Sequence, residues 1–217
     1  MFLGHFAVGM AAKRAAPKTS LGTLILAAMF LDVLWPCFLL LGIEQVRVDP
    51  GNTAVTPLDF VSYPWSHSLA MTLVWAALLG WIYRARTGYA VGALWLGICV
   101  VSHWVLDWVS HGPDMPLYPG GGPKLGLGLW NSAIATTCVE SLLFAAGIGI
   151  YVMTTKARDR IGAIALYALA IFLAALYALS RSSPPPPSVT AIAGTDIALI
   201  LIFLWAAWID RHRTVRP

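Results

Sequence analysis

Residues 161–179, IGAIALYALAIFLAALYAL, contain no charged side chain and no proline. About 20 consecutive residues of this kind cross the hydrocarbon core of a bilayer as a helix, because each residue adds ~1.5 Å. Working outward from this stretch, the chain offers further apolar segments of similar length, so six transmembrane helices are predicted. They cover residues 21–43, 64–84, 88–110, 127–153, 161–179 and 191–209.

The composition agrees with a membrane location. Of 217 residues, 59% are hydrophobic and 11% are charged, whereas ordinary soluble domains carry about 25% charged residues. So few charges cannot cover the surface of a water-soluble globule, which excludes soluble enzymes and disordered proteins. The net charge of +4 is spread over short clusters, so no nucleic-acid partner is expected. Cys37, Cys99 and Cys138 lie in apolar segments without C-x-x-C spacing, so neither a disulfide framework nor a thiolate zinc site is expected.

The predicted fold is therefore all-α, a polytopic membrane helix bundle that forms a single integral membrane domain over residues 1–217. Residues 1–12 are apolar but too short to span, so they are expected to form a re-entrant or an interfacial helix. Pro36 is expected to kink the first span because it removes a backbone donor.

The cations predict the orientation of the bundle. Arg47, Lys124 and Arg181 lie in connections that alternate with those holding the other eleven cations. The majority side is predicted to be cytoplasmic, together with both termini. The segments 44–63, 111–126 and 180–190 are then outside. The cytoplasmic set is Lys13, Arg14, Lys18, Arg84, Arg86, Lys156, Arg158, Arg160, Arg211, Arg213 and Arg216.

Ionisable residues inside the spans mark a candidate site. The four acids are Asp32, Asp107, Glu140 and Asp196, and the two histidines are His67 and His103. An ionised carboxylate in hydrocarbon costs at least about 2.5 kcal/mol, so such residues are usually functional. No Lys or Arg lies at membrane depth to neutralise them. A bound divalent cation would supply the missing charge.

Spacing and depth bring several of these residues together. His103 and Asp107 are four residues apart and share one helix face, and His111 follows at the next such step. Asp32 lies about 18 Å from the inner boundary, and His103 reaches a similar level from the outer side. His5 would reach roughly 12 Å if residues 1–12 enter from inside. Imidazole and carboxylate together suit zinc, manganese or iron.

Each of these residues also has a structural interpretation. His103 and Asp107 are equally well explained as a hydrogen-bonded pair, and His67 as a residue that caps a helix start. Asp196 fits a carboxylate that interacts with the dipole of its helix. Glu140 fits either a general base or a protonated carboxyl group that donates to a neighbouring helix.

The order of the motifs resembles the bacterial membrane-bound metal-dependent hydrolases, inner-membrane proteins typified by a LexA-regulated member. The motifs are Gly4-His5, Leu31-Asp32, Ser66-His67-Ser68 and His103-x-x-x-Asp107-x-x-Ser110. The resemblance covers residues 1–120, and the helices of residues 127–209 add no motif. It implies a bacterial inner-membrane location and five metal or catalytic positions. These positions are His5, Asp32, His67, His103 and Asp107.

The chain departs from the family pattern at several positions. Leu31 replaces a proline, Leu34 replaces a second aspartate, and Ser62 and Tyr63 replace a His-Arg pair. These departures imply one metal ion instead of two, another substrate, or lost activity.

The leading hypothesis is a metal-dependent hydrolase that acts at the outer membrane surface on a lipid or a lipid-linked phosphate or ester. Zinc is the first choice of metal, with manganese or iron as alternatives. Asp107 belongs to the expected catalytic set, with His67 or Glu140 as general base and His111 as the acid that protonates a leaving group. The entrance is expected to be lined by Tyr118, Trp130 and residues 120–122.

Two other functions remain open. The same acids and histidines would form a relay in a transporter or channel for protons or divalent cations. The third interpretation is a non-catalytic membrane protein with a structural polar site. Membrane lipids are the expected partners in every case, and the oligomeric state is not predicted.

Overall fold

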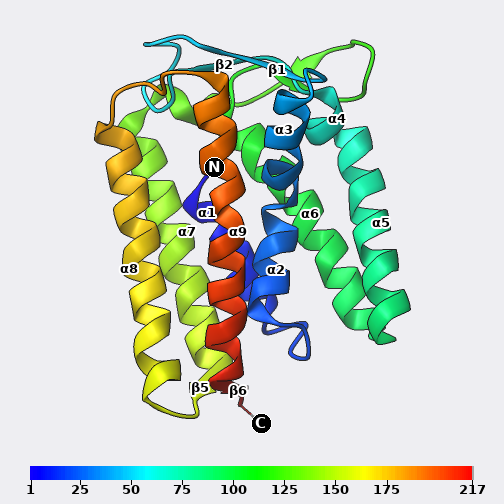
Figure 1. Ribbon diagram of the computed structural model, residues 1–217, viewed down its shortest axis with the longest axis vertical. Coiled ribbons are helices and arrows are strands. Elements are labelled where there is room, and N and C mark those ends of the chain that lie inside the picture. Colours follow the sequence, from blue (N-terminus) through cyan, green and yellow to red (C-terminus); the bar gives the residue numbers. More distant parts are fainter. Residues whose placement is uncertain (217) are drawn as a thin grey trace.

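The computed structural model describes residues 1–216, apart from the side chains of residues 196 and 197, so the expectation for Asp196 lies outside the described residues. Long helices lie side by side along the longest dimension of the molecule (Figure 1). The helices are α1 (Leu3–Ala12), α2 (Leu21–Ala28), α3 (Phe30–Leu40), α4 (Pro64–His67), α5 (Leu69–Thr87), α6 (Ala90–Ser110), α7 (Ala133–Thr154), α8 (Arg160–Ser182) and α9 (Val189–Arg211), with a 3₁₀ turn at Leu129–Asn131. The strands are β1 (Gln45–Val48), β2 (Leu58–Ser62), β3 (Met115–Pro116), β4 (Lys124–Leu125), β5 (Thr155–Ala157) and β6 (Arg213–Val215).

Four helices, α6 to α9, are long and apolar enough to cross a membrane, which indicates a membrane protein. The pair α2 and α3 becomes a fifth span if it is counted as one bent helix. The six predicted spans are not confirmed, because α5 does not reach this standard. Any membrane-length stretch of its 19 residues includes Arg84 and Arg86 of the last turn, which lower its apolar character.

The chain is mostly helical, as predicted, but short antiparallel hairpins that the sequence analysis does not predict lie at both ends of the bundle. β1 pairs with β2 and β3 with β4 at one end, and β5 pairs with β6 at the other. The alternation of Gln-Val-Arg-Val in β1 leaves Val46 buried between two exposed residues, as a strand with one buried face requires. β6 joins the C-terminal segment to the connection between α7 and α8.

The first predicted span is broken, and the break lies elsewhere than expected. α2 and α3 are bent by 57° at Met29, whose φ of −102° and ψ of 9° end α2. Pro36, where the kink was predicted, lies inside α3. The break interrupts the helical hydrogen-bond ladder at the Ala28 carbonyl, which becomes free to accept from another group.

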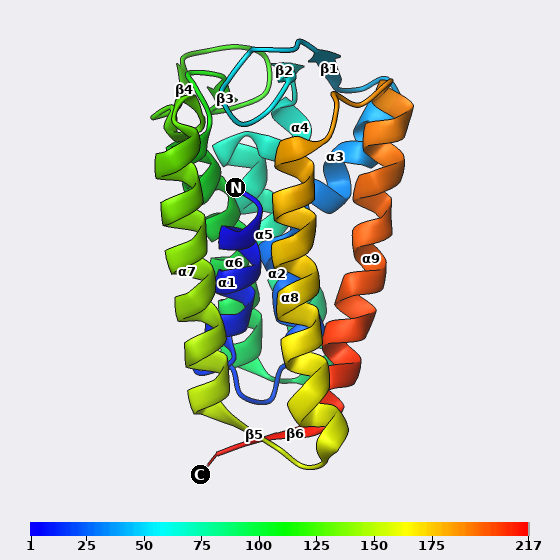
Figure 2. The same ribbon diagram turned by 90° about the vertical axis from the view of Figure 1, so that its left-hand side faces the viewer.

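α1 lies in the middle of the bundle and packs on α7, α2 and α6 (Figure 2). Glycines make this close packing possible. A Cβ atom on Gly147 of α7 would lie 2.6 Å from the Cα atom of Ala7, and a Cβ atom on Gly9 would lie 2.7 Å from the Cα atom of Ile25. Because most of α1 is buried, the structure favours the re-entrant over the interfacial expectation.

The cations gather at the two ends as the sequence predicts. The eleven assigned to the cytoplasmic side lie in the α1–α2 connection, at the end of α5, in the α7–α8 connection and around β6, all at the end that carries the β5–β6 hairpin (Figures 1 and 2). Lys13 is buried there and pairs with Asp210 at 2.6 Å. Arg47, Lys124 and Arg181 lie at the opposite end. The assignment of these ends to membrane faces stays a prediction.

Candidate metal centre

Two histidines and two aspartates from three helices converge inside the bundle. His103 Nε2 lies 3.0 Å from Asp107 Oδ2 and 3.5 Å from Asp32 Oδ1. His67 Nε2 lies 3.5 Å from the same Asp32 oxygen and 3.8 Å from Asp107 Oδ2. His67, His103 and Asp107 are buried, and Asp32 is half-buried. We call these four residues the His–Asp cluster.

His5 joins the His–Asp cluster from α1. Its Nε2 atom donates to Asp107 Oδ1 at 3.1 Å, and its ring stacks on His103 with centroids 3.8 Å apart. The amino group of Met1 also pairs with Asp107 Oδ1. The structure therefore brings together all five positions that the sequence assigns to a metal. They form two potential ligand groups that share His103, one with His5 and Asp107 and the other with Asp32 and His67.

Three helices, α3, α4 and α6, place the members of the His–Asp cluster. His103 and Asp107 face the same way because they are one turn apart on α6. Asp32 lies in the first turn of α3, where the helix dipole favours a negative charge. His67 ends the short helix α4, and the following Ser68 caps α5 by accepting from the Met71 N–H group.

The break between α2 and α3 fixes the orientation of His103. The Ala28 carbonyl at this break lies 2.7 Å from His103 Nδ1 and can only accept, so Nδ1 carries the proton. In the neutral ring, Nε2 then presents a lone pair to Asp32 and Asp107. Although Nε2 is buried and close to these oxygens, its geometry gives it no hydrogen-bond partner among the described residues.

A buried carboxylate that the sequence analysis missed orients His67. Glu44 Oε2 accepts from the Ser66 hydroxyl at 2.6 Å, and the Ser66 oxygen lies 2.7 Å from His67 Nδ1. Because the hydroxyl hydrogen is directed to Glu44, His67 Nδ1 donates to Ser66, and His67 Nε2 is turned toward the two aspartates. Glu44 Oε1 also accepts from the N–H groups of Trp65 and Ser66, both at 2.8 Å.

This donor set suits a cation. Two imidazole nitrogens and two carboxylates converge, and the ion pairs of the described residues include no Lys or Arg partner for Asp32 or Asp107. Four ligands of nitrogen and oxygen type are typical of zinc, and imidazole with carboxylate also suits manganese or iron. The Glu44–Ser66–His67 chain corresponds to the outer hydrogen bonds that usually orient metal-binding histidines. The residues therefore fit a divalent metal ion.

Glu140 holds the start of α1. Its Oε2 atom accepts from three successive backbone N–H groups, those of Phe2 at 2.9 Å, Leu3 at 2.5 Å and Gly4 at 3.3 Å. These amides have no partner within the helix, so the carboxylate satisfies them. This geometry favours a positioning role, and the general-base role of Glu140 stays a prediction.

His111 lies outside the His–Asp cluster, in a hydrogen-bonded group of its own. Its Nδ1 atom is 3.0 Å from Asp114 Oδ1, and the Tyr63 hydroxyl donates to the same oxygen at 2.7 Å. Burial and the adjacent Asp114 carboxylate raise the pKa of Tyr63 well above its ordinary value, so Tyr63 remains a donor. The His111 ring packs against Trp130, with centroids 4.2 Å apart.

A cavity of about 310 Å³ connects these groups. Asp32, His67, Asp107, His111 and Glu140 all line it. Its walls also include residues 55–58 of the β1–β2 loop, so it lies toward the end with few cations. Of the residues expected at the entrance, Trp130 lines this cavity. Tyr118 and residues 120–122 line a separate cavity of about 260 Å³, so that expectation is wrong for them.

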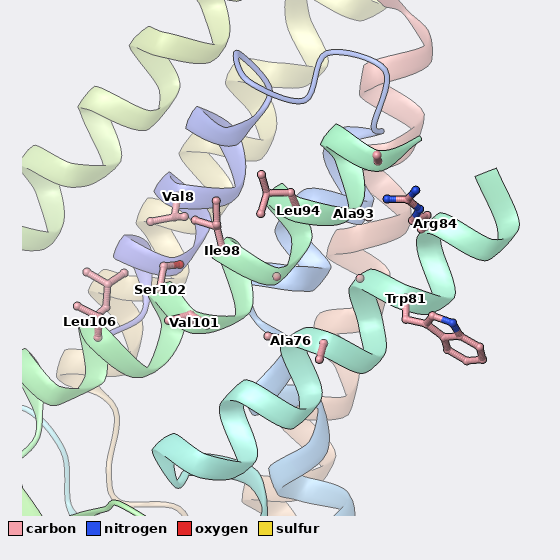
Figure 3. Close-up of a pocket in the computed structure, with 15 residues that line it drawn as sticks. Val8, Ala76, Trp81, Arg84, Ala93, Leu94, Ile98, Val101, Ser102 and Leu106 are labelled. Atoms are coloured by element: carbon pink, nitrogen blue, oxygen red, sulfur yellow. The ribbon is translucent and has the colours of Figure 1, made fainter. Parts of the chain in front are cut away.

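A larger cavity lies elsewhere. It is an apolar groove of about 870 Å³ between α5 and α6, reached by Val8 of α1, with Arg84 at one end (Figure 3). Ser102 is its other polar lining residue, and no histidine or carboxylate lines it. The groove therefore lacks the groups that acid–base or metal chemistry requires.

No protein-family model, curated protein or solved structure matches the chain. The resemblance to membrane-bound hydrolases therefore depends on the order of the motifs, and the geometry of the His–Asp cluster carries the functional argument.

Proposed function

We propose that the protein is a membrane-embedded, metal-dependent hydrolase whose divalent metal, zinc in the first instance, is held by Asp32, His67, His103 and Asp107. The supporting observation is the orientation of the two imidazoles. Each has its Nδ1 proton directed to an acceptor behind it, so each Nε2 lone pair is turned toward two carboxylates. Lone pairs and carboxylates repel one another, and a bound cation between them removes this repulsion, as a proton on an Nε2 atom also would.

A bound divalent cation supplies Lewis-acid chemistry, lowering the pKa of water and polarising a phosphoryl or acyl oxygen. The surrounding side chains have separate tasks. Asp107 is oriented by the hydrogen bond from His5. His111, at the cavity wall, is oriented by Asp114 and is placed to protonate a leaving group.

The proposed substrate is a lipid or a lipid-linked phosphate or ester. Aromatic residues of the cavity wall, Trp35, Phe60 and Trp130, offer an apolar surface beside the acids. The proposed location is the bacterial inner membrane with the C-terminal segment cytoplasmic, which places the cavity toward the outer face. The prediction of a cytoplasmic N-terminus is wrong, because the Met1 amino group lies inside the bundle beside Asp107.

Metal content tests the proposal. Purified wild-type protein is expected to contain about one tightly bound transition metal ion per chain, measured by elemental analysis. His103→Ala is expected to lose it. His212→Ala is the matched control, because His212 lies at the opposite end and pairs with Asp159. Absence of metal from wild type, or equal metal in His103→Ala, would overturn the proposal.

Turnover tests the chemistry. Asp107→Asn is expected to abolish hydrolysis of a lipid-phosphate panel while the melting temperature shows a folded protein. Equal turnover in the variant and in wild type contradicts the hydrolase. Metal or proton flux through protein-containing liposomes, without turnover, would instead support the transporter.

A further inference from the structure

Arg181 lines the cavity of the His–Asp cluster with a charged donor that has no hydrogen-bond partner among the described residues. It lies in the last turn of α8 and lines the same cavity as Asp32, His67 and Asp107. Its Nη1 atom is buried and has no hydrogen-bond partner among the described residues. A buried charged donor without a partner is costly, because the hydrogen bonds that it made to water in the unfolded chain are not replaced. An anionic ligand in the cavity would remove this cost.

Tyr177 strengthens this interpretation from one turn earlier on α8. Its side chain is 8% exposed and lines the cavity, and its hydroxyl group also lacks a hydrogen-bond partner among the described residues. The Arg181 guanidinium lies 6.0 Å from the centre of the Tyr177 ring. Two unsatisfied donors on one helix face therefore line one cavity.

The position of Arg181 alone has a simpler explanation, since a cation in the last turn of a helix interacts favourably with the helix dipole. That interaction does not require a buried Nη1 atom, nor an unsatisfied hydroxyl group beside it. A ligand with several acceptor oxygens would satisfy both groups. A guanidinium matches the geometry of phosphate or carboxylate, in which two oxygens accept in parallel.

We propose that Arg181 and Tyr177 bind the phosphate group of the substrate, which makes the substrate an anionic, phosphate-bearing amphiphile. The proposal deepens the proposed hydrolase and relies on it for the reaction, but the anion site itself can be measured without turnover. Arg181 holds the phosphate through its guanidinium, and Tyr177 donates its hydroxyl hydrogen. The apolar part of the ligand then lies along the aromatic wall of the cavity.

Binding by calorimetry in detergent tests the proposal, with dihexanoyl phosphatidic acid, inorganic phosphate and neutral dihexanoylglycerol as probes. Each probe is titrated into zinc-loaded and into chelator-treated protein. Arg181→Gln is expected to weaken phosphatidic acid binding at least about tenfold, because a charge-assisted hydrogen bond is lost. Tyr177→Phe is expected to weaken it by a smaller factor. Arg47→Gln is the matched control, because Arg47 lies at the same end and its side chain is 74% exposed.

The outcomes are distinct. Loss of affinity in Arg181→Gln and recovery in Arg181→Lys, with equal melting temperatures, supports the proposal. Arg181-dependent binding of phosphatidic acid identifies a lipid headgroup, and equally tight binding of inorganic phosphate identifies free phosphate. Equal affinity in wild type and Arg181→Gln, or no binding of either anion to wild type, overturns it. If chelator-treated protein keeps Arg181-dependent binding while wild type contains no metal, the hydrolase fails and the anion site stands.

Discussion

The imidazole rings of His5 and His103 stack face to face, with centroids 3.8 Å apart and planes 2° from parallel. One ring comes from the short helix α1 and the other from the long helix α6. The position of α1 in the bundle therefore determines one wall of the His–Asp cluster. Substitutions that displace α1 are expected to reach the candidate metal centre, even where they lie far from it.

Gly147→Ala is the first test of this relationship. The added methyl group would lie 2.6 Å from the backbone of Ala7, so α1 or α7 must move, at a cost of about 1–3 kcal/mol. A lower melting temperature and weaker metal binding are expected. Gly149→Ala is the matched control on α7, because no atom lies within 4 Å of its added methyl group. It is expected to be neutral or to stabilise by about 0.5–1 kcal/mol. Equal effects of the two substitutions would contradict this account.

Glu140→Ala removes the acceptor of three N–H groups at the start of α1. Because hydrogen bonds to charged groups contribute about 1.5–3 kcal/mol, faster amide exchange in residues 3–12 and a lower melting temperature are expected. Glu140→Gln retains one acceptor oxygen and should lose less. If Glu140→Gln abolishes turnover at unchanged stability, the residue is the general base instead.

Glu44→Gln tests the chain that orients His67. Loss of such an outer partner typically weakens metal binding by about 10- to 100-fold, and competition with a chelator measures this change. Ser66→Ala interrupts the same chain. The double variant is therefore expected to bind metal with the same affinity as whichever single variant binds it less tightly. Asp59→Asn, a carboxylate of β2 that pairs with the exposed Arg47, should leave metal affinity unchanged. An unchanged metal affinity in Glu44→Gln would show that Glu44 does not support the metal site.

Asp159, at the opposite end of the molecule, is expected to make the stability of the folded protein depend on pH. The hydrogen bond from His212, followed by that from the Gly162 N–H group, lowers the pKa of Asp159. A carboxylate with a lowered pKa stabilises the folded state above its unfolded pKa of about 4, and the effect disappears as the pH falls through the folded value. Asp159→Asn keeps a good helix cap and removes the charge. Wild type is expected to melt higher than Asp159→Asn at pH 7, and the difference should vanish in acid. A difference independent of pH would contradict the assignment.

Much of the candidate site is predictable because charge inside a membrane is rare. Asp32, His67, His103 and Asp107 are found from their depth and from the spacing of four residues on one helix. Glu44 is not found in this way, because it directly follows an apolar stretch and resembles the first residue of an exposed loop. Its burial depends on α4 lying beside it, a tertiary contact that no local pattern encodes. The sequence signal that could have identified Glu44 was the presence of a lone carboxylate at the end of a predicted span.

The fold is predictable where helices are long. Residues 161–179 lie within α8 as expected, but the break at Met29 has no sequence marker, since neither Gly nor Pro occurs there. Pro36 is a marker that misleads, because a proline removes one hydrogen bond without always ending a helix. The hairpins are missed because strands of two to five residues are too short to give a clear alternation.

The break between α2 and α3 links the depth of the site to a single point in the backbone. The same interruption frees the Ala28 carbonyl for His103 and starts the helix whose first turn holds Asp32. Shifting the break by one helical turn would move both groups by about 5.4 Å along the bundle, while His67 and Asp107 would stay where they are. The length of α2 thus sets the depth within the bundle at which Asp32 and the acceptor for His103 lie.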